Sequence, residues 1–283
     1  MQNEMQATTN PRLQLLTRWS VVIALLAGLA AWIYVAPPGL MGKLDAIGYA
    51  VCHRLESHSL KIGELQMPLC ARCTGEFNAA AVALIFQALV SPQQSRLPSR
   101  GVLAVLAGLF LAFAFDGSNS YLALMKTTDP GTLSAIPSLY VTNSVTRVLT
   151  GSGMGLVLAS VLYPMYNQSV WRVPGQERAL NWKKFAALAA LLLVVDLGIL
   201  SESPWVLYPV AALRALGILA LLTIIFSIVW ITIMRQDNTF LGFRQLWLPA
   251  AAGLTLAFMM IIGIDLVRLN LTHTWGGFPG LEG

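Results

Sequence analysis

The chain has 283 residues, of which 56% are hydrophobic and only 11% are charged, and its formal net charge is +5. This composition lies outside the range of soluble globular domains and predicts an integral membrane protein. The net charge is what basic cytoplasmic loops produce, and no basic stripe with interleaved aromatic residues indicates a nucleic-acid partner. The expected partner is the lipid bilayer.

Apolar runs long enough to cross about 30 Å of hydrocarbon as helices recur along the chain. Barrel strands would be shorter and would alternate in polarity. We therefore predict an all-α, polytopic bundle of transmembrane helices with about seven spans. The predicted spans are 19–36, 75–91, 101–116, 144–163, 185–200, 211–234 and 246–267.

The first apolar run has basic residues before it, as a signal peptide does. We interpret it as an uncleaved anchor because it continues past Ala30 and Ala31 and ends only at Pro37. Between the first two spans, residues 40–56 predict a surface helix, followed by a turn at Ile62 and Gly63.

Polar segments divide the chain into regions. The expected regions are a disordered cytoplasmic tail (1–18), a four-span module (19–166) with a loop at 37–74, a cytoplasmic linker (167–184) and a three-span C-terminal bundle (185–283). On the side of the N-terminus the loops carry ten lysines and arginines, against six on the other side. This difference predicts a cytoplasmic N-terminus and an extracytoplasmic loop at 37–74.

All three cysteines and two of the three histidines of the chain fall between Val51 and Phe77. Cys70 and Cys73 form a C-x-x-C pair, and a loop of this length can fold back to bring Cys52 and His53 to them. These four residues would make a Cys3His site for a transition metal, zinc first and copper second. Since adjacent residues rarely both reach one ion, His58 is the natural substitute for His53.

Other uses of the cysteines stay open. Two of them could form a disulfide that closes the loop, or Cys70 and Cys73 could be a redox-active pair. A c-type haem is disfavoured because Thr74, rather than histidine, follows the C-x-x-C pair. Nothing resembles a nucleotide-binding loop, so we expect no nucleotide cofactor.

Several polar side chains fall in or at the ends of the predicted spans, where a charge is costly unless it is paired or hydrated. Asp116 and Arg147 could form a buried pair near the cysteine loop, Asp196 could pair with Arg214, and Asp265 could pair with Arg268. The intramembrane polar candidates are Glu76, Asp116, Asn143, Arg147, Asp196, Asp265 and Arg268.

Small residues spaced four apart are typical of close helix contacts in membranes. Gly151 and Gly155 have this spacing on the fourth predicted span, and Ala104 and Gly108 have it on the third. We interpret both pairs as packing positions.

The segments VCHRLESHS, PLCARCTG, DG and TN-x-x-x-R-x-x-TG resemble a family of predicted prokaryotic membrane proteins, domain-of-unknown-function family 2085. The resemblance covers about residues 47–156 and implies that the cysteine loop and the region from Asp116 to Arg147 form one module in a prokaryotic inner membrane. It implies no activity. The chain departs from the family pattern at His58, Asn119 and Ser120. The matching positions are Cys52, His53, Arg54, Ser59, Pro68, Cys70, Arg72, Cys73, Gly75, Asp116, Gly117, Asn143, Arg147 and Gly151.

Three hypotheses follow for the function. The first is a membrane protein that binds a transition metal through its extracytoplasmic Cys/His loop. The second is a membrane thiol-disulfide oxidoreductase that uses the C-x-x-C pair, and the third is a non-enzymatic assembly or accessory subunit whose partners are other membrane proteins. The sequence leaves open whether the protein is an enzyme.

Overall fold

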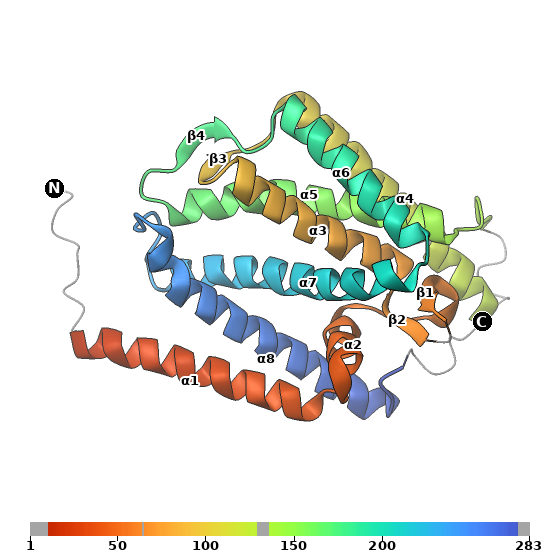
Figure 1. Ribbon diagram of the computed structural model, residues 1–283, viewed down its shortest axis with the longest axis horizontal. Helices are drawn as coiled ribbons and strands as arrows, with labels where there is room; N and C mark the ends of the chain where they lie inside the picture. The colour runs from red at the N-terminus through yellow and green to blue at the C-terminus, as the bar shows by residue number, and fades with distance from the viewer. Residues whose placement is uncertain (1–10, 64, 129–135, 277–283) are drawn as a thin grey trace.

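The structure is a computed structural model, and it describes residues 11–63, 65–128 and 136–276 (Figure 1). Within these residues the chain forms eight α-helices and two small two-stranded sheets. The helices are α1 (Pro11–Val35), α2 (Gly39–Val51), α3 (Ala71–Val90), α4 (Arg100–Thr128), α5 (Ser144–Val170), α6 (Trp182–Leu200), α7 (Pro204–Ile233) and α8 (Trp247–Thr272). The strands are β1 (Ser59–Ile62), β2 (Leu65–Cys70), β3 (Gln94–Arg96) and β4 (Gly175–Arg178), and the 3-10 helices are η1 (Glu56–His58) and η2 (Phe243–Leu246).

The predicted helical bundle is confirmed, and each of the seven predicted spans overlaps a long helix. Six of these helices are long and apolar enough to cross a membrane, namely α1, α3, α4, α5, α7 and α8. The seventh, α6, has 19 residues, among them Lys183, Lys184 and Asp196. The structure therefore supports six spans by length and composition, where we expected about seven.

The first and last residues of some helices differ from the predicted ones. The first helix begins at Pro11, well before the expected start at Trp19, so the predicted disordered tail is helical from Pro11. Residues 1–10 of that tail lie outside the described residues. The predicted surface helix at 40–56 is present as α2, and it ends earlier, at Val51.

Helices α3, α5 and α7 run side by side through the middle of the molecule (Figure 1). Helix α8 packs against α7, and α1 lies along α8. On the other side of the bundle α4 packs against α5. A large hydrophobic cluster joins the middle helices, with Ala80 and Ala83 of α3 against Leu156 and Ala159 of α5.

Helices α3 and α5 approach each other at glycines of α5. A Cβ atom on Gly151 would collide with the carbonyl oxygen of Arg72, and one on Gly155 would collide with that of Glu76. The predicted packing role of Gly151 and Gly155 is therefore confirmed. Gly108 on α4 differs, since a Cβ there would meet nothing within 4 Å.

Local signals explain where the central helices begin. Asn143 caps α5 by accepting a hydrogen bond from the Thr146 amide at 2.9 Å, and the Thr146 hydroxyl accepts one from the Asn143 amide at 3.1 Å. Asn181 caps α6 in the same way, and α7 begins with Pro204. The side chain of Asn143, a predicted polar candidate, thus starts a helix.

The loop between α2 and α3 contains an antiparallel β-hairpin, β1 and β2, that we did not predict. Its turn contains Gly63, whose φ of +59° is the left-handed conformation that glycine adopts readily. The turn was predicted, but the strands were not. The hairpin places Ser59 opposite Cys70 and so brings the second cysteine back toward the end of α2.

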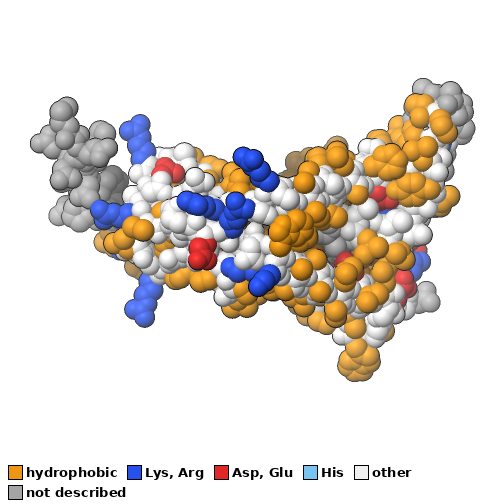
Figure 2. All heavy atoms as spheres, turned by 90° about the horizontal axis from the view of Figure 1, so that it is seen from above, with side chains coloured by type: hydrophobic (Ala, Val, Ile, Leu, Met, Phe, Trp, Pro, Cys, Tyr) orange, Lys and Arg blue, Asp and Glu red, His pale blue; other side chains and the backbone are white. Residues whose placement is uncertain are grey.

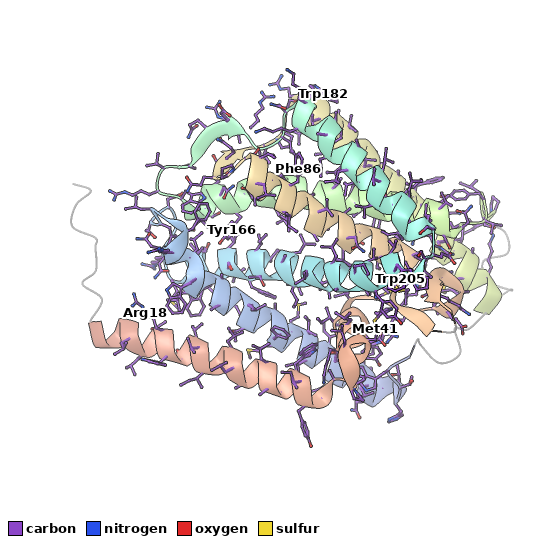
Figure 3. All side chains as sticks on the ribbon, viewed as in Figure 1. Arg18, Met41, Phe86, Tyr166, Trp182 and Trp205 are labelled. Carbon is purple, nitrogen blue, oxygen red and sulfur yellow. The ribbon has the colours of Figure 1, made fainter. Side chains whose placement is uncertain are left out.

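The two ends of the bundle differ in charge. On the face seen in Figure 2, lysine and arginine side chains gather over the half of the molecule that holds the N-terminal end of α1, and the other half is mostly hydrophobic. Trp182 is the first residue of α6 and Trp205 is the second residue of the antiparallel α7, and both rings are exposed (Figure 3). Exposed tryptophans at helix ends are typical of membrane interfaces.

Candidate functional site

The three cysteines converge at the end of the bundle that carries the hairpin. Cys52 follows the last residue of α2, Cys70 ends β2, and Cys73 lies in the first turn of α3. Their sulfur atoms all lie within 4.8 Å of one another. Cys52 and Cys70 are buried, Cys73 is half-buried, and all three are free thiols. Three separate elements thus bring three soft ligands to one point.

The sulfur of Cys52 accepts hydrogen bonds from the backbone. The amides of Cys70 and Arg54 point at it, with N to S distances of 3.3 and 3.4 Å. Hydrogen bonds from the neighbouring thiols of Cys70 and Cys73 lower the pKa of Cys52 well below its usual value, against the effect of burial. The same contact with Cys52 raises the pKa of Cys70 to about 12. Cys52 is therefore the first of the two to ionise.

His53 and His58 lie beside the cysteines and contact each other. Nε2 of His53 is 3.4 Å from Nδ1 of His58, and the two rings meet edge to face. Burial lowers the pKa of His53, and burial with the nearby Arg147 lowers the pKa of His58 to about 4. Both imidazoles are therefore neutral near pH 7, the form that binds metal.

Neither histidine completes the predicted four-ligand set in this structure. Among the described residues, the group of three or more donor atoms that all lie within 4.8 Å of one another consists of the three sulfurs and includes neither histidine. The arrangement is thus a set of three cysteines, with a histidine pair nearby rather than within it.

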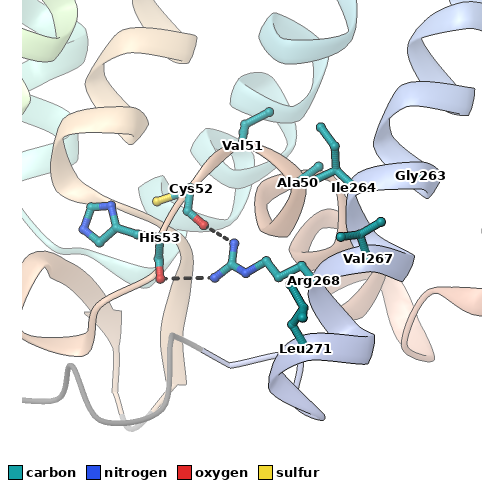
Figure 4. A pocket seen from close by; sticks show the side chains of 9 residues that line it. All are labelled: Ala50, Val51, Cys52, His53, Gly263, Ile264, Val267, Arg268 and Leu271. Carbon is teal, nitrogen blue, oxygen red and sulfur yellow. Dashed lines mark hydrogen bonds between the residues drawn. The ribbon is translucent and has the colours of Figure 1, made fainter.

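Arg268 of α8 holds the chain on either side of Cys52. Its guanidinium donates to the carbonyl oxygens of Tyr49 and Cys52, both at 2.5 Å, and of His53 at 3.2 Å. It also stacks on the ring of Tyr49, 3.9 Å from the ring centre. Figure 4 shows the Cys52 sulfur and the His53 ring on the side of the chain away from Arg268. The arginine therefore holds the backbone and leaves the Cys52 sulfur and the His53 ring on the opposite side of the chain.

Arg54 adds a second attachment for the same segment. Its backbone has a φ of +55°, which turns the chain sharply after His53. Its guanidinium lies 3.4 Å from the Asp45 carboxylate on α2 and donates to the carbonyl oxygen of Trp275 at 2.5 Å. The middle of α2 and the chain after α8 are thereby attached to the loop.

Arg72, between the two cysteines of the C-x-x-C pair, forms an ion pair with Asp116 of α4 at 2.5 Å. Asp116 is only 1% exposed, and it also accepts hydrogen bonds from Tyr140 at 2.6 Å and Thr150 at 3.2 Å. Partial burial, and then this carboxylate, raise the pKa of Tyr140 to about 12, so its hydroxyl stays a donor.

This network corrects the predicted pair of Asp116 and Arg147. Arg147 instead donates to the hydroxyl of Thr142 at 2.9 Å and to the carbonyl oxygen of Ser57 at 3.4 Å. Arg72 lies on α3 next to the ligands, and the packing of α3 on α5 carries its long side chain to Asp116. Sequence spacing alone does not distinguish these two arginines.

The predicted pair of Asp196 and Arg214 is also corrected. Asp196 accepts a hydrogen bond from Ser152 of α5 at 2.5 Å. Arg214 of α7 is 1% exposed and donates to the hydroxyl of Thr74, which follows Cys73, at 3.2 Å. Arg214 therefore belongs to the surroundings of the cysteines, although we did not predict it as a site residue.

The remaining polar candidates are placed as follows. Glu76 lies on α3, half-buried, in the turn after Cys73. Asp265 is buried on α8, and its Oδ1 atom has no hydrogen-bond partner among the described residues. Arg268, its expected partner, donates hydrogen bonds to the three carbonyl oxygens described above.

Sequence reasoning missed the hydroxyl groups that complete these contacts. Tyr140, Thr150, Ser152 and Thr74 each bond a charged side chain. Of these, Thr150 and Thr74 stand within the segments TN-x-x-x-R-x-x-TG and PLCARCTG, so the family resemblance was a usable signal for them.

The fold and this end of the bundle define a multi-pass helical membrane protein with a buried cluster of three cysteines. Residues 52–161 match the family described as predicted membrane protein (DUF2085), which confirms the resemblance seen in the sequence. The match begins at Cys52 and ends within α5, so it contains the cysteines, Arg72, Asp116 and Arg147 but neither Arg214 nor Arg268. No curated protein and no solved structure matches the chain.

Proposed function

We propose that this protein binds one transition metal ion, zinc first and copper second, through Cys52, Cys70 and Cys73. The observation that carries the proposal is the convergence of three sulfurs within 4.8 Å of one another, from three elements that meet only in the folded chain. Thiolate ligands select zinc and monovalent copper over harder cations. A zinc ion with three cysteines keeps a fourth position, which water or one of the two neutral histidines can occupy.

The charge around the cluster supports the same proposal. The arginines that contact the ligand segments outnumber the carboxylates near them; they are Arg54, Arg72, Arg147, Arg214 and Arg268, against Asp45, Glu76 and Asp116. A divalent ion held by three thiolates carries a net charge of −1. Such a centre would offset part of this buried positive charge, which is costly when left alone.

The proposed location is the extracytoplasmic surface of a prokaryotic inner membrane. The cysteine cluster and the N-terminal end of α1 lie at opposite ends of the bundle (Figure 1). The excess of basic loops at the N-terminal end favours a cytoplasmic position for that end. The metal would then be bound outside the cytoplasm, where it could be structural, delivered to a partner or transported.

The test is to purify the protein in detergent without added metal or reductant, and to measure bound metals and free thiols together. We expect about one zinc or copper ion per chain, with the thiols protected from alkylation. Cys52→Ser, Cys70→Ser and Cys73→Ser should each abolish stoichiometric metal. His53→Ala should weaken binding if its imidazole takes the fourth position, whereas His273→Ala, the matched control at the end of α8, should leave it unchanged.

A second candidate is a thiol-disulfide oxidoreductase, favoured by the backbone amides that point at the Cys52 sulfur. The sequence predicted Cys70 and Cys73 as the reactive pair, whereas these amides favour Cys52 as the attacking thiolate. The Cys52 thiolate would attack a disulfide of a substrate, and Cys70 or Cys73 would resolve the mixed disulfide. The protein would end with a disulfide, and the substrate with two thiols. A redox-dependent mass shift without bound metal would favour this candidate, and a stable disulfide with one free thiol and no activity would favour an accessory subunit.

A further inference from the structure

A second site lies at the end of the bundle away from the cysteines. A cavity of about 650 Å³ lies between α3, α5, α7, α8 and the η2 turn. Leu84 and Tyr163 form its buried floor, while Ile85, Leu216 and Phe243 are exposed at its edge. The cavity therefore opens on the outer surface of the helices, which is the surface that faces lipid in a membrane protein.

The walls of this cavity are apolar, and most polar groups in them already have partners. The hydroxyls of Tyr163 and Ser227 donate to backbone carbonyl oxygens at 3.0 and 2.9 Å. The indole of Trp171 donates to Asn167 at 2.9 Å. A ligand recognised by several hydrogen bonds would find few free groups here, whereas a hydrocarbon chain needs none.

Two arginines are adjacent in sequence to residues that line the cavity. Arg172 directly follows Trp171, and Arg244 directly follows Phe243; both arginines are exposed. The two segments are joined, since the Arg172 amide donates to the carbonyl oxygen of Phe240 at 2.9 Å. Basic side chains next to an apolar, lipid-facing cavity match a molecule with an anionic head and a hydrocarbon tail.

We propose that this cavity binds one acyl chain of an anionic phospholipid, whose headgroup lies at Arg172 and Arg244. The chain would fill the space between the α3 and α5 pair and the α7 and α8 pair, where the helices do not close on each other. This proposal is independent of the metal site, because it rests on other residues at the other end of the same helices.

The first test fills the cavity. Ala220 lines it from α7, and Ala220→Phe would place a ring in the space that the chain needs. Gly108→Phe on α4 is the control, since a Cβ there meets nothing within 4 Å. Both variants and the parent protein are reconstituted in nanodiscs of equal phosphatidylglycerol and phosphatidylcholine, transferred to detergent, and weighed by native mass spectrometry.

We expect the parent protein and Gly108→Phe to retain about one phosphatidylglycerol per chain and Ala220→Phe to lose it. Equal retention in all three proteins would overturn the proposal, because it would indicate lipid bound elsewhere on the surface. Absence of retained lipid from the parent protein would overturn it as well.

The second test addresses the headgroup and does not depend on a filled cavity. The double change Arg172→Gln and Arg244→Gln should reduce the preference for phosphatidylglycerol over phosphatidylcholine by roughly fivefold per arginine. The matched control, Arg100→Gln and Arg178→Gln, removes two basic residues from the same end of the bundle. If both double variants lost the preference for phosphatidylglycerol equally, the preference would come from general surface charge, and the proposal would be contradicted.

Trp171 provides a third readout if Ala220→Phe does not fold. The ring is only 2% exposed, so ordinary surface lipid has little access to it. Phosphatidylglycerol with brominated chains should quench its fluorescence through the cavity, and the quenched component should disappear in Trp171→Phe. The same quenching before and after that substitution would show that no chain reaches this ring.

Discussion

The two ends of the bundle are built on different principles. At the cysteine end, buried charged and polar side chains hold loop and helix backbones together, with Arg268 and the pair of Arg72 and Asp116 as the main ties. At the other end, apolar helices part around a cavity, and the basic residues are exposed. Among the described residues, the buried arginines contact the segments around the cysteines or the residues next to them, and the buried charges Asp196 and Asp265 lie elsewhere on α6 and α8. The difference teaches that buried arginines are used mainly to hold the backbone near the cysteines. The predictions below test this contrast, starting with the largest effect.

The contact of α3 with α5 should be the least tolerant part of the cysteine end. Gly151→Ala adds a Cβ that collides with the carbonyl oxygen of Arg72. Because backbone must move to accommodate it, we expect a loss of stability of at least about 3 kcal/mol, at the upper end for overpacking. The measurement is thermal unfolding in detergent, with size-exclusion chromatography to detect misfolded protein. Gly108→Ala is the control and should be neutral or stabilising by up to about 1 kcal/mol; equal behaviour of the two variants would refute the close contact.

Arg268 should come next, because it serves three carbonyl oxygens at once. Arg268→Met keeps much of the side-chain volume but leaves these buried groups without a donor, at a cost of about 3 kcal/mol. Metal affinity should fall roughly 10- to 100-fold, as for other residues that hold a ligand in place. Competition with a zinc chelator measures the affinity. Arg244→Met changes an exposed arginine at the opposite end and should alter stability by less than about 0.5 kcal/mol. A similar loss of stability in both variants would show that the two ends do not differ in this way.

Asp116 should have a smaller effect, since it acts on the ligands through Arg72. Asp116→Asn keeps the shape and some hydrogen bonds but removes the ion pair, so we expect metal affinity to fall by about tenfold and stability by about 2 kcal/mol. The same chelator competition and unfolding measurements apply, with Glu177→Gln as an exposed acidic control. If metal affinity and stability were the same in Asp116→Asn and Glu177→Gln, Arg72 would have no role in positioning the cysteines.

Glu56 should have the smallest effect, although it lies close to the site in sequence. Its side chain is exposed, and its ion pair with Lys61 at 2.6 Å lies on the surface of the loop. The hydrogen bond from Lys61 lowers the pKa of Glu56, but exposed pairs contribute little because solvent screens them. Glu56→Gln should therefore leave both the unfolding temperature and the metal content unchanged. A clear loss of metal would extend the site to the surface of the loop.

The helices could be predicted from the sequence because hydropathy over a membrane span is a strong signal. All seven predicted spans overlap helices, and the surface helix before Cys52 was also foreseen. The hairpin was not, because Leu65–Cys70 contains Pro68 and lacks the alternation of a typical strand. Its strands are defined instead by the pairing of Ser59 with Cys70, a contact that no local pattern reveals.

The cysteines could be identified as candidates from their spacing, but their neighbours could not. Asp116 has several arginines within reach of a folded bundle, and only the packing of α3, α4 and α5 selects Arg72. Arg214 lies 140 residues from Thr74, so nothing in its own surroundings marks it as part of this end of the molecule. For the histidines, sequence proximity placed His53 and His58 near the cysteines, but it did not predict that the two imidazoles contact each other.

The position of Arg268 in α8, far from the cysteines in sequence, has a consequence for biosynthesis. Its hydrogen bond to Cys52 joins residues 216 positions apart, so the cysteine loop leaves the ribosome long before the side chain that secures it. A chain truncated before α8 would contain all three cysteines and yet lack their main clamp. The cysteine end of the protein therefore acquires this attachment only after α8 has been synthesised and packed against the loop.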